Sequence, residues 1–231
     1  MAGPDTPRGR ARAQTLVDIR RVALEQLAVE GSAGLSLRAV ARELGVVPSA
    51  LYRYVANRDE LVTTLVLDAY AELAASVGEA TSRGPRRRQR ARWRAGAQAL
   101  RVWASAQPAR FQLLYGSPVP GYAAPPETVG PALAVVVAML APVVDAAATH
   151  PDEAPVPGRV LARQLEDVAT GLGIEVPPAL LARAVAAWSE VVGLVVLELG
   201  GHFVGGFEPA DALFDAAVRD QAERLGLRDQ P

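Results

Sequence analysis

One stretch of the chain, LRAVARELGVVPSALYRY from residue 37 to residue 54, constrains the fold more than any other. Apolar side chains recur in it at helical spacing and are expected on the inner faces of two short helices: Val40, Leu44, Val46 and Leu51. Gly45 marks the turn between these helices, because glycine takes a left-handed backbone conformation at no steric cost. Pro48 suits the first turn of the second helix, where no amide hydrogen is needed. The pattern predicts a helix-turn-helix, a unit that places its second helix in the major groove of DNA.

The segments on either side of this unit are expected to complete a compact helical domain. A preceding helix is predicted from about residue 13 to residue 30, where a glycine follows. Ser36 is a good N-cap for the first helix of the motif. Asn57 and Glu60 form a capping box that opens a longer helix after the motif. Three helices and the start of a fourth are therefore expected within the first part of the chain.

The first twelve residues are rich in Gly, Pro and Arg and are expected to form a disordered arm. Arginines placed before a DNA-binding unit can reach phosphates or a minor groove. A solvated tail is the simpler interpretation, since chain ends are poorly ordered in general. The predicted domains are an arm over residues 1–12, a helix-turn-helix domain over residues 13–60 and a helical domain over residues 61–231.

The composition predicts an all-α protein and excludes several kinds of chemistry. Half of the 231 residues are hydrophobic, 5% are aromatic, and every periodic segment has helical spacing. The chain has no cysteine, which excludes disulfides, thiolate metal sites and cysteine nucleophiles. Its two histidines, His150 and His202, lie far apart and do not make a typical zinc site without several carboxylates. With neither a G-x-S-x-G elbow nor a phosphate-binding glycine loop, the sequence predicts no enzyme, no metal and no cofactor.

The charge of the chain is unevenly distributed. The net charge of −1 does not itself suggest a nucleic-acid partner. Residues 83–110 contain arginines and no acidic residue, whereas the chain from Phe111 onward is acidic. The arginines between Arg86 and Arg94 are either an additional DNA contact or a solvated helix start. The solvated face is favoured, because charge runs usually have this role.

No segment of the sequence predicts a membrane or a secreted protein. The N-terminus carries arginines but no apolar run behind them, so it does not resemble a secretory signal. The most apolar segment, residues 129–144, is interrupted by Pro131 and Pro142 and is shorter than the ~20 residues that span a bilayer. The protein is therefore expected to be soluble and cytoplasmic.

The segment LGVVPSALYRYVANRDELV, which joins the helix-turn-helix to the next helix, resembles the tetracycline-repressor (TetR) family of transcriptional regulators. The resemblance covers about residues 16–65. Its most specific matches are Gly45, Leu51-Tyr52, Tyr54 and Asn57-Arg58-x-Glu60-Leu61. It implies an all-helical homodimer whose C-terminal domain binds a small organic effector and provides the dimer interface. The implied function is that of a repressor that binds palindromic double-stranded DNA and is released by its effector.

The resemblance and the side-chain chemistry together assign the contacts to DNA bases. Arg38 matches a family position that can touch a base, and arginine suits guanine, although a phosphate or solvent contact is an equal alternative. Pro48 and Ser49 begin the recognition helix and are expected at base edges. Val47 stands where the family often has Ser or Thr, and offers an apolar contact to a thymine methyl.

Other residues of the same region are expected at the phosphate backbone. Tyr52 and Tyr54 match family positions that hold phosphates, and partial burial of Tyr54 is compatible with this role. Arg58 is expected to bind a phosphate beside the amides that open its helix. Arg53 reaches the groove or is solvated. The predicted DNA contacts are Ser36, Arg38, Val47, Pro48, Ser49, Tyr52, Arg53, Tyr54 and Arg58.

Two C-terminal helices are expected to hold the dimer together. The first, over residues 178–205, is apolar over so wide an arc that it must be covered on two sides. The second, over residues 209–226, has one apolar face, so that two chains would form a four-helix bundle. The segment around Trp188 resembles the Trp-His-Gly motif of one C-terminal domain type of the TetR family. Val192 stands in place of the histidine of that motif.

A small, mostly apolar effector is expected in a pocket between the C-terminal helices. Large side chains are its candidate lining, although each is equally an ordinary core residue: Trp103, Phe111, Tyr115, Met139 and Trp188. Two further functions stay open, namely a DNA-binding dimer without an effector and a scaffold that has lost DNA binding. The sequence identifies neither the effector, the operator nor the regulated genes.

Overall fold

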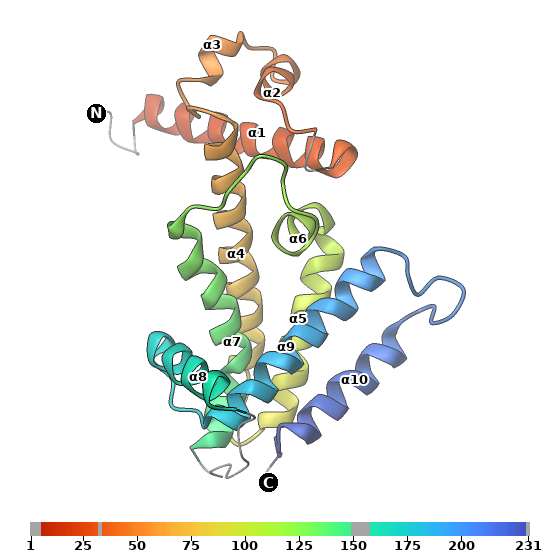
Figure 1. Ribbon diagram of the computed structural model, residues 1–231. Coiled ribbons are helices and arrows are strands. Elements are labelled where there is room, and N and C mark those ends of the chain that lie inside the picture. The colour runs from red at the N-terminus through yellow and green to blue at the C-terminus, as the bar shows by residue number, and fades with distance from the viewer. Residues whose placement is uncertain (1–5, 32–33, 149–157, 230–231) are drawn as a thin grey trace. The chain divides into compact units, whose positions relative to one another are not determined.

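The computed structural model describes residues 6–31, 34–148 and 158–229 of the chain. This part is built of α-helices and contains no β-strand, which confirms the predicted all-α class (Figure 1). Contacts divide the chain into two units. Unit 1 comprises Met1–Ala69 with Gln107–Thr128, and unit 2 comprises Tyr70–Ala106 with Val129–Pro231. The segment at residues 107–128 thus groups with the N-terminal helices, whereas the sequence assigned it to the domain over residues 61–231.

Unit 1 contains the helix-turn-helix around a small apolar core. Its helices are α1 (Pro7–Glu30), α2 (Leu37–Glu43), α3 (Pro48–Leu51), the first half of α4 (Arg58–Ser82), α6 (Pro108–Tyr115) and a 3-10 turn (Pro126–Thr128). α2 packs on α1 and α3, and α6 packs on α1. The core side chains come from all five α-helices and include Ile19, Ala23, Val40, Ala41, Leu51, Leu61 and Phe111.

The first helix begins six residues earlier than the sequence predicted. α1 starts at Pro7, and the hydroxyl of Thr6 accepts a hydrogen bond from the amide of Gly9 at 3.0 Å. Thr6 is a favourable N-cap and Pro7 fits the first helical position, so a start signal was present in the sequence. The predicted disorder is therefore wrong for residues 7–12, while residues 1–5 lie outside the described part.

The turn of the motif has the predicted backbone geometry. Gly45 has a φ of 67°, in the left-handed region. The amide of Val46 then donates to the carbonyl of Ala41 at 3.0 Å, which closes the C-terminal cap of α2. The expectation that Val46 faces inward is wrong, because 39% of it is exposed. The left-handed residue before it directs the chain away from α2.

The helix caps in unit 1 follow the predicted pattern with one shift. The hydroxyl of Ser36 accepts from the amide of Ala39 at 3.5 Å. The side-chain oxygen of Asn57 accepts from the amide of Glu60 at 2.8 Å. The Glu60 carboxylate accepts in return from the amide of Ala56, one residue before the expected partner. The start of α4 is thus fixed by side chains on both sides of the junction.

Unit 2 is a helical bundle centred on one helix. Its helices are α5 (Gln89–Ala106), α7 (Val129–Ala147), α8 (Arg159–Leu172), α9 (Pro178–Leu199), α10 (Asp211–Arg224) and the second half of α4. α5 packs on α7, α9 and α10, and α8 packs on α9. Gly96 lets α5 approach its neighbours, because a Cβ there would lie 2.6 Å from a methyl of Thr81 and 3.1 Å from the sulfur of Met139.

Buried arginines tie these helices together. Arg92 is 6% exposed and pairs with Asp145 of α7 at 2.5 Å, while it also donates to the carbonyls of Thr81 and Arg86. Arg94, which is more exposed, pairs with Asp215 of α10 at 2.8 Å. Part of the arginine run therefore packs within unit 2. Arginine can bury the aliphatic part of its side chain while carboxylates and carbonyls accept the hydrogen bonds of its guanidinium group.

Two helix boundaries differ from their predicted positions, and a third helix continues through a proline. α7 continues through Pro142 and spans 19 residues. α9 ends at Leu199 and not at residue 205, because Gly200 and Gly201 form a turn in which Gly201 has a φ of 73°. α10 begins at Asp211, two residues after the predicted start at residue 209.

By length and composition alone, three helical segments of the described chain are long and apolar enough to cross a membrane: Arg58–Ser82, Pro126–Ala147 and Pro178–Leu199. The expected shortness of the apolar segment at residues 129–144 is therefore wrong. In unit 2 the helices α7 and α9 pack on each other, so part of their apolar surface is covered within the fold.

Candidate nucleic-acid interface

The short helix α3 presents most of the predicted base contacts to solvent. Val47, Pro48 and Ser49 are exposed at its start, with 64% exposure of Val47. Val47 occupies the N-cap position and makes no side-chain cap, as its lack of a hydroxyl predicts. Leu51 is 1% exposed and anchors the helix to the core. The outer face of α3 is thus free to enter a groove, while a single leucine holds its inner face.

Four of the predicted contacts line one shallow groove. This groove has a volume of about 510 Å³ and lies between α2, the end of the recognition segment and the start of α4. Its lining includes Ser36, Arg38, Tyr52 and Arg58. Tyr52 is 50% exposed, and its phenol is therefore available to a partner at this groove. A surface with hydroxyls and guanidinium groups around a shallow groove has the chemistry that binds a phosphate backbone.

Tyr54 is held by a residue that the sequence did not single out. It is half-buried, and the guanidinium carbon of Arg12 lies 5.0 Å from the centre of its ring. The same guanidinium donates to the carbonyl of Arg53 at 3.4 Å from each terminal nitrogen. The start of α1 is therefore attached to the end of the recognition segment. An arginine in a segment expected to be disordered gave no signal for this contact.

Arg58 has a different environment from the one predicted. Its guanidinium donates to the carbonyl of Leu35 at 3.1 Å and to that of Pro120 at 3.3 Å, and lies 3.7 Å from the carboxylate of Asp59. The hydroxyls of Thr63 and Tyr122 form a further hydrogen bond of 3.0 Å. Side chains at the start of α4 are thus bound to the proline-rich loop after α6. Tyr122 was missed, because a lone tyrosine in a loop carries no periodic signal.

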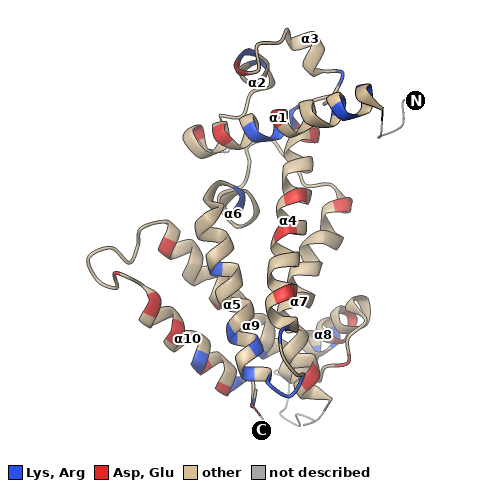
Figure 2. Cartoon of the chain, turned by 180° about the vertical axis from the view of Figure 1, so that it is seen from behind, with Lys and Arg blue, Asp and Glu red and all other residues tan. Residues whose placement is uncertain are grey.

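Figure 2 marks both basic and acidic positions along α1 and α2 of unit 1. Between residues 6 and 56 the chain has eight arginines and only four carboxylates, although its overall net charge is −1. Arg20 pairs with Asp68 at 3.0 Å and Arg21 with Glu25 at 2.8 Å. Arg38, Arg42 and Arg53 make no ion pair among the described residues. Unpaired arginines on an exposed face are the electrostatic footprint of a nucleic-acid surface.

The five candidate effector contacts are divided between the two units. Phe111 and Tyr115 belong to unit 1, where their ring centres are 5.2 Å apart and Phe111 is fully buried. Trp103, Met139 and Trp188 belong to unit 2. There Met139 is fully buried beside Gly96, while Trp103 and Trp188 are half-buried.

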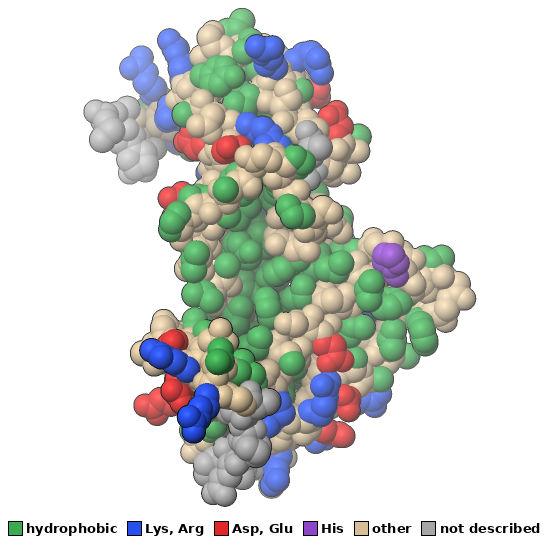
Figure 3. Space-filling model, in the orientation of Figure 1, with side chains coloured by type: hydrophobic (Ala, Val, Ile, Leu, Met, Phe, Trp, Pro, Cys, Tyr) green, Lys and Arg blue, Asp and Glu red, His purple; other side chains and the backbone are tan. Residues whose placement is uncertain are grey.

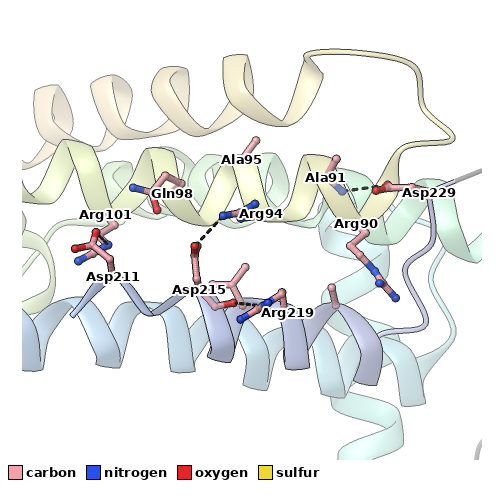
Figure 4. A pocket seen from close by; sticks show the side chains of 12 residues that line it. Arg90, Ala91, Arg94, Ala95, Gln98, Arg101, Asp211, Asp215, Arg219 and Asp229 are labelled. Carbon is pink, nitrogen blue, oxygen red and sulfur yellow. Dashed lines mark hydrogen bonds and ion pairs between the residues drawn. The ribbon is translucent and has the colours of Figure 1, made fainter. Parts of the chain in front are cut away.

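Unit 2 has a groove that contains none of these candidates. The groove lies between α5 and α10, has a volume of about 590 Å³ and is lined by both charged and small apolar side chains (Figure 4). Its carboxylates are already bound: Asp211 to Arg101 at 2.9 Å, Asp215 to Arg94 at 2.8 Å, and Asp229 to the amide of Ala91 at 3.1 Å. Among the described residues, no group of three His, Cys, Asp or Glu side chains is placed to hold a metal ion.

Two family matches account for most of the chain. Residues 19–65 match the bacterial regulatory proteins of the TetR family, and residues 93–221 match the tetracyclin repressor-like C-terminal domain. The chain belongs to the TetR family. Members of this family regulate transcription and are not enzymes; they bind DNA and dimerise, and are in general soluble and cytoplasmic. The assignment to the Trp-His-Gly domain type stays a prediction.

Relatives support this membership over nearly the whole length. The HTH-type transcriptional regulator Rv1816 of Mycobacterium tuberculosis (strain ATCC 25618 / H37Rv) is 40% identical over 214 residues, which cover 90% of this chain and 88% of the relative. The crystal structure of the regulatory protein SCO4313 is similar with a TM-score of 0.77 and 37% identity, covering 94% of this chain and 100% of that one. A TetR family regulator from Marinobacter aquaeolei VT8 has a TM-score of 0.61 at 18% identity, covers 92% of this chain and 97% of its own, and supports the fold alone.

Proposed function

We propose that this TetR-family protein is a cytoplasmic repressor that binds a palindromic operator as a homodimer and is released by a small organic effector. The observation that carries the proposal is the exposed recognition surface of unit 1. Its base-facing residues are solvent-exposed, and its arginines Arg38 and Arg53 are not neutralised by carboxylates among the described residues.

The proposed contacts divide into bases and backbone. Val47, Pro48 and Ser49 face base edges in the major groove, and they carry the choice of sequence. Tyr52 and Tyr54 hold phosphates and fix the register of the helix. Arg58 requires an exchange of partners to bind a phosphate, because two backbone carbonyls already accept its hydrogen bonds.

For the dimer interface we favour α9 with α8 rather than α9 with α10. On α10, Phe214, Val218 and Ala222 are buried within unit 2 and Leu213 is half-buried, while its exposed positions include the charged Asp220 and Glu223. On α8 only Leu165 is buried, while Val160, Leu161 and Val168 are 75%, 37% and 44% exposed. Further exposed apolar residues lie on α9 and in the loop after it: Val185, Leu197, Val204 and Phe207. Figure 3 shows hydrophobic side chains over the face formed by α7 and α9.

The proposed effector is mostly apolar and contacts Trp103 and Trp188 of unit 2. Both are half-buried, so a ligand can reach a part of each ring. The third tryptophan, Trp93, is fully buried and donates to Gln221 at 3.3 Å, which makes it an internal reference. Phe111 and Tyr115 belong to unit 1 and are not part of this proposed site.

The test starts with selection of duplexes from a random pool by the purified protein. A palindrome with half-sites about one helical turn, ~34 Å, apart supports the proposal. Binding of an unrelated random duplex with equal affinity contradicts it. A library of apolar compounds is then screened for release of the selected duplex and for quenching of tryptophan fluorescence, with W103F and W188F as variants. Quenching that persists in both variants would mean that Trp103 and Trp188 do not contact the effector. A library without any active compound would favour an effector-independent DNA-binding dimer.

A further inference from the structure

The start of α1 has an unusual charge for its position in a helix. Arg8, Arg10 and Arg12 lie in its first two turns, and no acidic residue is present in the first turn. The N-terminal end of a helix carries a partial positive charge, so cations there are unfavourable and anions are favourable. The helix dipole therefore does not favour these arginines at this position.

Two of these arginines share one side of the helix. Arg8 and Arg12 are four residues apart, which places them one turn from each other on the same side. Arg12 already marks the direction of this side, because it contacts the Tyr54 ring and the Arg53 carbonyl. Arg8 therefore lies one turn, ~5.4 Å, farther along α1 from the contact with the recognition segment.

Arg8 has no partner of its own among the described residues. It is exposed and makes neither a hydrogen bond nor an ion pair there. Arg12 uses its guanidinium edge for a single carbonyl, at the long distance of 3.4 Å, and also remains exposed. Exposed basic side chains lie on unit 1 in the space-filling view of Figure 3. An exposed guanidinium next to a phosphate-binding tyrosine is suited to the neighbouring phosphate.

We propose that the first two turns of α1 are a second DNA-binding element, in which Arg8 and Arg12 bind backbone phosphates beside the half-site read by α3. This inference rests on the proposed binding of DNA by the helix-turn-helix. It adds contacts that fix position and affinity without adding sequence choice. Arg12 has a double role, because it also positions Tyr54 through the ring contact.

The experiment measures affinity for a duplex selected by the wild-type protein, and for a random-sequence duplex of equal length, between about 50 and 200 mM salt. A dimer carries two copies of Arg8, so R8Q is expected to lower the slope of log K against log salt by about 1.8. The corresponding loss of affinity is about thirtyfold near physiological salt and is equal for single-base variants of the selected duplex. R8K is expected to keep the slope.

R21Q is the matched control, since it removes one exposed positive charge from the same helix, where Arg21 pairs with Glu25. It is expected to change the slope by much less than R8Q, while circular dichroism shows the same helix content for both. A duplex with neutral methylphosphonates at the flanking phosphates is expected to weaken the wild type but not R8Q.

Equal affinities and slopes for R8Q and R21Q would overturn the inference while leaving the helix-turn-helix function intact. A loss confined to duplexes with particular flanking base pairs would also overturn it, because it would indicate base reading in the minor groove. A wild-type protein that selects no duplex would overturn the proposed function together with this element.

Discussion

Arginine has opposite roles in the two units of this protein. On α5 of unit 2, Arg92, Arg94 and Arg101 each bind a carboxylate of another helix. On the helix-turn-helix of unit 1, Arg38 and Arg53 are exposed and make no ion pair with a described residue. The same side chain therefore serves packing where its charge is matched and recognition where it is not. Net charge, which is −1 for the whole chain, hides this difference.

The arginine run at residues 86–94 does not have a single role, because some of its members pack inside unit 2 and others stay in solvent. Arg92 can be buried because Asp145 and two backbone carbonyls accept the hydrogen bonds of its guanidinium group. Arg90 stays exposed on the same helix and makes no hydrogen bond or ion pair with a described residue. What separates a packing arginine from a recognition arginine is the presence of an acceptor on a neighbouring helix, which depends on tertiary structure.

The largest effect is expected for a substitution that breaks the ion network of unit 2. Arg101 is 8% exposed, pairs with Glu198 at 2.6 Å and Asp211 at 2.9 Å, and lies 4.9 Å from the centre of the Phe214 ring. The hydrogen bond to Glu198, with that to Asp211, raises the pKa of Arg101 above its ordinary value. R101M is expected to lower the free energy of unfolding by about 3 kcal/mol, because it removes the charge-assisted hydrogen bonds of a nearly buried guanidinium and leaves the half-buried Glu198 carboxylate without this partner. Urea unfolding followed by circular dichroism measures it.

The control for this prediction is R224M. Arg224 binds Glu190 at 2.7 Å and Asp220 at 2.8 Å, but it is about half exposed. Solvent screens such a pair, so R224M is expected to cost less than about 1 kcal/mol. Equal losses for the two variants would mean that burial does not distinguish the arginines of unit 2.

The next largest effect is expected at Arg38 and decides between its two possible contacts. If Arg38 binds a guanine edge, R38A costs about 1–3 kcal/mol of DNA affinity per half-site and relaxes the preference at one base pair. If it binds a phosphate, the loss is equal for all sequences and the salt slope falls. Affinity measured against every single-base variant of the selected duplex separates the outcomes. R42A is the control on the same helix, and an equal change for both variants would argue against a specific role of Arg38.

The local elements of this fold could be predicted because their signals are local. Gly45 needs the left-handed conformation, Ser36 and Asn57 cap helices, and each of these is visible in a few adjacent residues. The length of α1 was missed because the arginine-rich start was interpreted by composition, although Thr6 and Pro7 supplied a cap and a first turn.

The contacts within the candidate site could not be predicted, because they join residues far apart in the sequence. Arg12 reaches Tyr54 across 42 positions, and Arg58 reaches the carbonyl of Pro120 across 62. A periodic pattern reports the face of a helix and not which loop covers it. The exposed surface of α3 was predictable from the motif, whereas the partners of its flanking arginines required coordinates.

The smallest effect is expected at the loop that binds the start of α4. The hydroxyls of Thr63 and Tyr122 are 3.0 Å apart and Thr63 is 8% exposed, so Y122F leaves a nearly buried hydroxyl without this partner. A loss of about 0.5–1.5 kcal/mol in the free energy of unfolding is expected, together with an unchanged salt slope of DNA binding, because no phosphate contact is removed. The double variant T63V/Y122F removes both polar groups and is expected to be more stable than Y122F alone. A change in salt slope for Y122F would mean that this loop itself contacts DNA. Tyr122 would then have a role in recognition as well as in the packing of unit 1.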